Sequence, residues 1–130
     1  MKLNSEQFEQ LIAEALDGLP KNILKKMHNV VITQSDFPTE DQLDRLKKDN
    51  KFNLLGIYEG CTQSRRTNVG AVLPDKITLF RVPIINACSS LKQCKKIVSN
   101  TLKHEIAHHF GSDEKGARKA EKYRKGRAAN

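Results

Sequence analysis

The chain has 130 residues, a length that suits one domain built around one hydrophobic core. Hydrophobic residues make up 38% of it and tryptophan is absent, so the core is expected to be small. No apolar run approaches the length of a membrane span, which argues against functions carried out by membrane-spanning proteins. The formal net charge is +8, and most of it lies within residues 115–130.

The first residues and the cysteines predict the cellular compartment of the protein. The N-terminus is polar and has a helical pattern rather than the apolar stretch of a secretory signal. Cys61, Cys88 and Cys94 are odd in number, which argues against a disulfide framework. We therefore expect reduced thiols and a cytoplasmic protein, with Cys94 as a small core residue.

The first half of the chain predicts two helices and a strand. Asn4 or Ser5 can cap a first helix that ends near Gly18 and Pro20. The apolar stripe of this helix consists of Phe8, Leu11, Ile12, Ala15, Leu16 and Leu19. Residues 28–33 are short and β-branched, which predicts a strand. Residues 38–41 open a second helix that ends among residues 47–50.

The second half predicts two more strands and the longest helix. Residues 53–60 are expected to form a strand that leads into a glycine turn, and residues 61–72 are polar and irregular. Residues 76–82 alternate in the manner of a strand that Pro83 ends. A helix is predicted from about residue 90 to 110, and a last helix over about 113–124.

These elements predict an α+β domain covering residues 1–130, with a small mixed sheet of about three strands packed against helices. The two later strands are too close in sequence for a helical crossover. Residues 115–130 are expected to form a basic C-terminal helix or tail. Such a run is most often solvated, and nucleic-acid binding is the less favoured alternative because only Tyr123 offers a stacking surface there.

Residues 104–108 have the pattern H-E-x-x-H. On a helix, His104 and His108 lie on the same face one turn apart, so two imidazole nitrogens can bind one metal ion. Glu105 is offset by about 100° and can reach a metal-bound water without binding the metal. Two ligands, a general base and an open water position are the parts of a zinc hydrolase.

The flanks of the motif support this interpretation. The preceding helix has an inward stripe that continues onto the motif and consists of Leu91, Cys94, Ile97, Val98, Thr101 and Leu102. Gly111 can end the helix, and a carboxylate at Glu114 can then return as a third ligand. The alternative is a solvated helix face with two histidines and a salt-bridging glutamate.

The chain resembles the small, minimal zincin-like metallopeptidases of bacteria. The resemblance covers nearly the whole length and includes the early helix, residues 54–60, residues 73–81 and, most specifically, residues 104–111. It implies a stripped-down zincin fold with a short sheet and an active-site helix. It also implies that His104 and His108 bind one zinc ion per chain and that Glu105 is the general base.

The chain departs from the family pattern H-E-x-x-H-x-x-G-x-x-D at its last position. Glu114 stands where the family has aspartate, and Asp113 precedes it. Both are oxygen donors acceptable to zinc, and Glu114 is favoured by register. His109 is expected to be either a donor to a ligand or a packed core residue.

These observations predict a zinc-dependent peptidase acting on a peptide or protein substrate. The strand at residues 77–80 is expected to be the sheet edge that holds an extended peptide. An oxyanion donor is also needed, and Tyr58, Arg66, Arg81 and His109 are candidates. The alternatives are a zinc-binding regulatory or interaction domain without turnover and a basic nucleic-acid adaptor. The sequence does not predict the oligomeric state.

Overall fold

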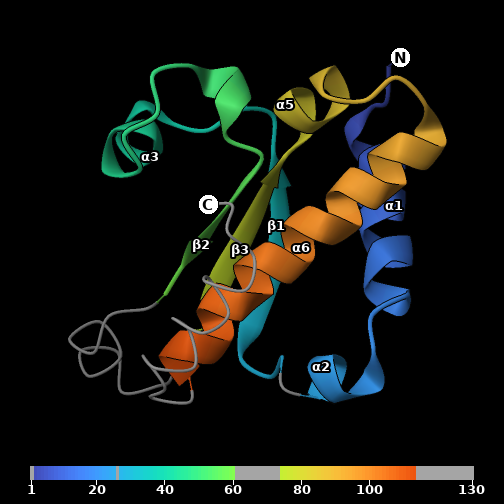
Figure 1. The fold of residues 1–130 in the computed structure, drawn as a ribbon, viewed down its shortest axis with the longest axis vertical. Coiled ribbons are helices and arrows are strands. Elements are labelled where there is room, and N and C mark those ends of the chain that lie inside the picture. Colours follow the sequence, from blue (N-terminus) through green and yellow to red (C-terminus); the bar gives the residue numbers. More distant parts are fainter. Residues whose placement is uncertain (1, 26, 61–73, 114–130) are drawn as a thin grey trace.

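The computed structural model of the chain describes residues 2–25, 27–60 and 74–113, with the backbone alone at residues 109–113. The elements in chain order are α1 (Ser5–Asp17), α2 (Lys21–Lys25), β1 (Val30–Ser35), α3 (Glu40–Arg45), η1 (Lys51–Asn53), β2 (Gly56–Glu59), β3 (Asp75–Phe80), α5 (Arg81–Asn86) and α6 (Leu91–Asp113). They form an α+β fold in which helices pack on a small sheet (Figure 1).

The sheet has the strand order β1-β3-β2. β1 runs parallel to β3, and β2 runs antiparallel to β3, so the predicted mixed sheet of about three strands is confirmed. β3 is the central strand, and the prediction that residues 77–80 form a sheet edge is therefore wrong. Its run of apolar residues fits a strand that is covered on both faces, whereas an edge strand usually keeps polar positions.

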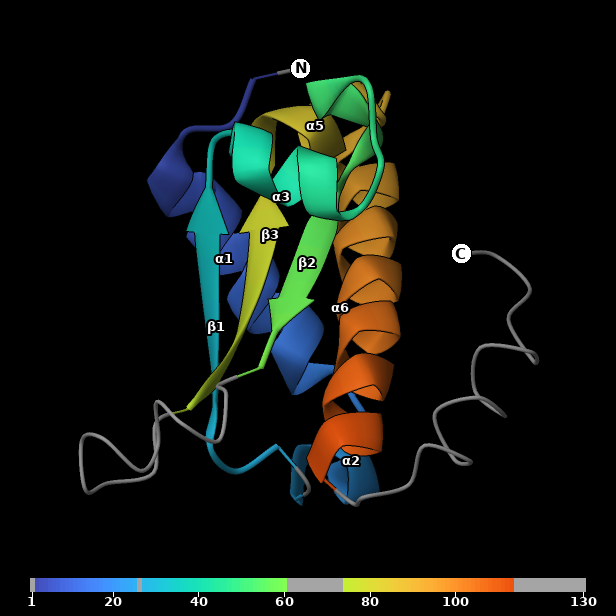
Figure 2. The same ribbon diagram turned by 90° about the vertical axis from the view of Figure 1, so that its left-hand side faces the viewer.

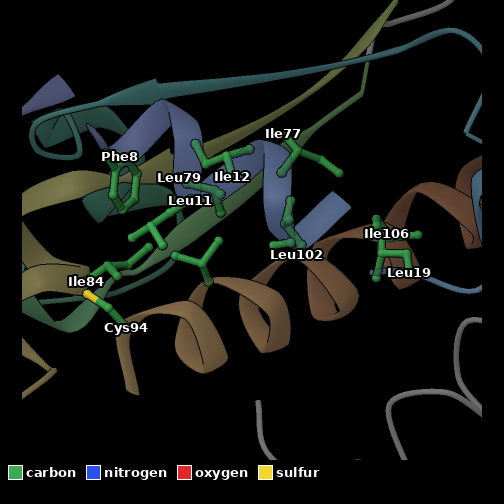
Figure 3. Close-up of a cluster of buried hydrophobic side chains, with 12 residues drawn as sticks. Phe8, Leu11, Ile12, Leu19, Ile77, Leu79, Ile84, Cys94, Leu102 and Ile106 are labelled. Atoms are coloured by element: carbon green, nitrogen blue, oxygen red, sulfur yellow. The ribbon is translucent and has the colours of Figure 1, made fainter. Parts of the chain in front are cut away.

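One face of the sheet packs against the two long helices, α1 and α6 (Figure 2). The side chains of β3 that point to this face include Ile77 and Leu79, which are fully buried. They contact the apolar stripes of both helices in the main core cluster (Figure 3). On the other face, Leu43 of α3 packs against a second cluster made of Leu54, Ile57 and Phe80.

The start of α1 is capped as predicted. The Asn4 side chain accepts a hydrogen bond from the Gln7 backbone N–H at 2.8 Å, and the Gln7 side chain accepts one from the Asn4 N–H at 2.9 Å. This reciprocal pair satisfies two backbone donors at the helix end. It positions the helix so that Phe8, Leu11 and Ile12 enter the core.

α6 approaches β2 closely because residue 56 is glycine. A Cβ atom built at Gly56 would lie 2.8 Å from Cγ2 of Thr101 and 3.2 Å from a Leu79 methyl group. The first distance is too short for a methyl group unless Thr101 moves, and the second is tight, so the close approach of strand and helix depends on the absence of a side chain at residue 56. The close approach brings the helical residues that follow Thr101 next to the end of β2.

Several element boundaries differ from the prediction. Arg81 and Val82 start the short helix α5 rather than ending β3, and Pro83 is tolerated because it lies in the first turn of α5. α6 continues through Gly111 to Asp113, so the predicted helix end at residue 110 is wrong. A glycine within a helix costs about 1 kcal/mol relative to alanine, which does not by itself end it. Residues 61–72, and residues 114–124 of the predicted last helix, lie outside the described part of the chain.

The cysteines differ from the prediction as well. Cys88, which follows α5, and Cys94, in the first turns of α6, form a disulfide with their Cα atoms 5.3 Å apart. The expectation of reduced thiols for this pair is therefore wrong, although Cys94 is buried in the core as expected. An odd number of cysteines leaves one over but does not prevent two near in sequence from pairing. Within the described ranges, no helix is both long and apolar enough to span a membrane.

Candidate metal centre

The H-E-x-x-H residues lie on the C-terminal half of α6. This part of the helix sits at the end of the sheet where β3 begins and β2 ends (Figures 1 and 2). Ile106 and Leu102 on the same helix are fully or almost fully buried in the core. Their packing fixes the rotation of α6 about its axis, so that Glu105 faces the fold and the two histidines are half-buried.

His104 and His108 lie side by side along the helix. Their ring centroids are 5.1 Å apart, with the ring planes at 61°. Four residues span about 6 Å along a helix axis, so the two imidazoles project from successive turns. Imidazole nitrogens on successive turns of one helix are a donor pair that zinc accepts, and the predicted pairing of the two side chains on one face is present.

Glu105 is a buried carboxylic acid. Only 8% of the surface of Glu105 is exposed. Burial raises the pKa of Glu105 from its ordinary value of 4.5 to about 7, because the ionised form loses hydration. A hydrogen bond from the Tyr58 backbone N–H acts in the opposite direction and lowers the pKa. A carboxyl group with a pKa near neutrality can both accept and release a proton at neutral pH.

Tyr58 joins the strand to the motif at a second point. Its ring centroid lies 6.2 Å from that of His108, with the planes tilted by 34°. The Tyr58 hydroxyl donates a hydrogen bond of 2.5 Å to the Asp75 carboxylate at the start of β3. Asp75 is only 3% exposed. This acidic residue was not predicted as part of the site.

A sequence signal for Asp75 did exist. In a strand, alternate residues point to the same face, and Asp75 is in phase with Ile77 and Leu79 of the core. A carboxylate at an inward position is costly unless it has partners, so its phase marks it for a specific role. The diagonal neighbour of Asp75 across the sheet is Tyr58, because Tyr58 is paired with Ile77.

The structure separates Arg81 from the other candidates. The Arg81 guanidinium bonds to Asp36 at 3.0 Å and donates to the Leu3 carbonyl at 2.6 Å. It follows the far end of β3 from Asp75, roughly 20 Å away at about 3.3 Å per strand residue. Arg81 is therefore tied to the N-terminal segment and is not gathered at the site.

The remaining candidates are not described in full. Asp113 and His109 belong to α6, but only their backbone is described. Glu114 and Arg66 lie outside the described residues. Among the described side chains, no group of three or more His, Cys, Asp and Glu could hold a metal ion. The third ligand, whether Glu114 or Asp113, therefore stays a prediction.

Comparisons with known proteins bear on the family and the fold of the chain. The sequence profile of the zincin-like metallopeptidase family matches residues 27–123. A solved structure, described as a conserved hypothetical protein from Thermus thermophilus, shares the fold with a TM-score of 0.58 at 18% identity. The match covers 84% of this chain and 95% of that one. No curated protein matches the chain at a significant level.

Proposed function

The chain belongs to the zincin-like metallopeptidase family, and from this premise we propose that it hydrolyses peptide bonds with zinc bound by His104 and His108. One observation carries the proposal. The carboxyl group of Glu105 is buried beside the histidine pair, with its pKa raised to about 7. A buried glutamate is costly, and a nearby divalent cation would stabilise its charged form.

The described side chains supply two of the ligands that a catalytic zinc ion takes. Catalytic zinc sites take three protein ligands and leave the fourth position to water. The two half-buried histidines supply two imidazoles, and the proposal assigns the third ligand to Glu114, or to Asp113 as the alternative. A closed structural zinc site would need four ligands and is usually rich in cysteine. Cys88 and Cys94 are bonded to each other, so they cannot supply thiolates.

The proposed chemistry divides between the ion and the chain. Bound zinc would supply a water of low pKa and polarise the substrate carbonyl. The Glu105 carboxylate accepts a proton from the attacking water and releases it to the leaving nitrogen. The Tyr58 N–H holds one side of this carboxylate, which keeps it in place during both transfers. An extended substrate would lie along β2, the strand next to α6 whose outer side has no partner strand in the described sheet.

The first experiment compares metal content and hydrolysis. Protein purified without chelators is analysed for zinc as wild type, His104→Ala, Glu105→Gln and Asp36→Asn. Asp36 is exposed, pairs with Arg81 at the other end of β3 and serves as the control. We expect about one zinc per chain in wild type, in Asp36→Asn and in Glu105→Gln, and little in His104→Ala.

The same proteins are then incubated with a broad peptide library. Glu105→Gln should hydrolyse the peptides at least about 100-fold more slowly than wild type, because the amide cannot accept the proton of the attacking water. Wild-type protein that binds no zinc, even after the metal is added back, would refute the proposal. Zinc-loaded wild type that leaves the library uncut would leave a zinc-binding domain without turnover, the alternative predicted from the sequence.

A further inference from the structure

Tyr58 contacts both functional parts of the H-E-x-x-H helix from a different element of the fold. Its backbone N–H donates to Glu105, and its ring lies against the ring of His108. Its hydroxyl donates to Asp75. One residue of β2 thus touches the base and a histidine of α6 while being bonded to β3.

The hydroxyl end of Tyr58 lies close to both Asp75 and Gly60. Asp75 accepts its hydrogen bond at 2.5 Å, within the range of charge-assisted O–H···O⁻ bonds, which are stronger than neutral ones. A Cβ atom built at Gly60 would lie 2.9 Å from the hydroxyl oxygen. Because Gly60 has no side chain, the ring can lie in the position that reaches Asp75.

The bond also decides what the hydroxyl can do. A phenol has one proton to donate, and in this structure that proton is directed to Asp75. The Tyr58 hydroxyl is therefore not directed at a substrate oxyanion, the role considered for it from the sequence. The geometry gives it a structural task at the site instead.

We propose that Tyr58 and Asp75 form a positioning pair that holds the His108 ring and the Glu105 carboxylate in their binding and reacting orientations. The inference rests on the proposed function, since it assigns these residues to a metal centre. Asp75 acts through Tyr58: the buried carboxylate anchors the hydroxyl, the anchored ring limits the rotation of His108, and the anchored strand presents the N–H to Glu105. Outer partners that orient metal ligands typically contribute about 10–100-fold to metal affinity.

The test uses three variants of the full chain. Tyr58→Phe removes the hydroxyl and keeps the ring. Asp75→Asn removes the charge and keeps the shape. Gly60→Ala retains both polar groups but displaces the hydroxyl with a methyl group. Asp36→Asn, which breaks the Asp36–Arg81 ion pair at the other end of β3, is the control for general loss of stability.

Two readouts are measured on each variant. Zinc affinity, from competition with a chromogenic chelator, should fall about 10–100-fold in the three test variants and stay within about two-fold of wild type in Asp36→Asn. In metal-free protein, the ring signals of His108 in the NMR spectrum should shift or broaden in the test variants only. Unchanged His108 signals in both Tyr58→Phe and Asp75→Asn would overturn the positioning pair.

The two readouts separate the two proposals. The NMR comparison needs no metal, so it decides on the positioning pair even if wild-type protein binds no zinc. Absence of zinc binding by wild type would refute the proposed function alone. Equal losses of zinc affinity in the test variants and in Asp36→Asn would show a general effect of stability and would also overturn the positioning role.

Discussion

The buried Glu105 predicts an unusual dependence of stability on pH in metal-free protein. Its pKa is about 7 in the folded chain and 4.5 ordinarily. At about 1.4 kcal/mol for each pH unit, the difference corresponds to about 3 kcal/mol. Because the folded pKa is raised, the folded state binds more protons than the unfolded state between these values. The stability that protonated Glu105 contributes is fully present below pH 4.5 and is lost as pH rises through 7.

Glu105→Gln removes this titration and keeps the side chain's size. We expect the free energy of unfolding of the variant, relative to wild type, to rise by about 3 kcal/mol between about pH 4 and about pH 8. The assay is urea unfolding of chelator-treated wild type and variant at several pH values. Other titrating groups are common to both proteins, so the difference between the two isolates Glu105.

The control is Glu14→Gln, an exposed carboxylate on α1. Hydrogen bonds from Gln10 and Lys95, together with the Lys95 charge, lower the pKa of Glu14, so this variant should not gain stability as pH rises. Parallel pH profiles for wild type and Glu105→Gln would refute the reasoning, because they would show that Glu105 ionises in the folded chain as it does in water. Zinc added at about pH 8 should stabilise wild type, since its charge compensates the carboxylate.

Three further predictions concern the stability of the fold. Gly56→Ala should destabilise the fold by about 1–3 kcal/mol, because its Cβ would lie 2.8 Å from Thr101 Cγ2, and Thr101→Ser in the same chain should recover part of the loss in a thermal melt. No recovery of the melting temperature by Thr101→Ser would contradict this explanation of the loss. Arg81→Gln should cost about 1 kcal/mol in urea unfolding, through its bonds to Asp36, and leave zinc affinity unchanged; a fall in affinity would place Arg81 functionally at the site. Asn4→Ala should lower the free energy of unfolding in urea by about 1 kcal/mol, because it removes the α1 cap. An unchanged midpoint of the urea transition would argue against a stabilising cap.

The local patterns of the chain were enough to predict α1, α3, the three strands, α6 and the motif face, but not the short helices α2, η1 and α5. The helix period places His104 and His108 together, and this depends only on residues four apart on one helix. The Asn4 cap and the stripe of α1 are likewise set by near neighbours. The α+β class followed from the alternation of such segments. Boundaries were predicted less well, because Gly111 and Pro83 are tolerated in helical positions that their propensities alone do not favour.

Only the tertiary structure decided which residues surround the motif. Strand order places β3 at the centre of the sheet, and this fact does not follow from the sequence of a single strand. The register that pairs Tyr58 with Ile77 also makes Tyr58 the diagonal neighbour of Asp75, and the contact at Gly56 brings α6 against β2. Strand pairing and close packing join residues far apart in the chain, whereas periodicity and capping act within a few residues. The sequence by itself therefore determined the H-E-x-x-H face of α6, and the packed sheet determined which residues surround that face.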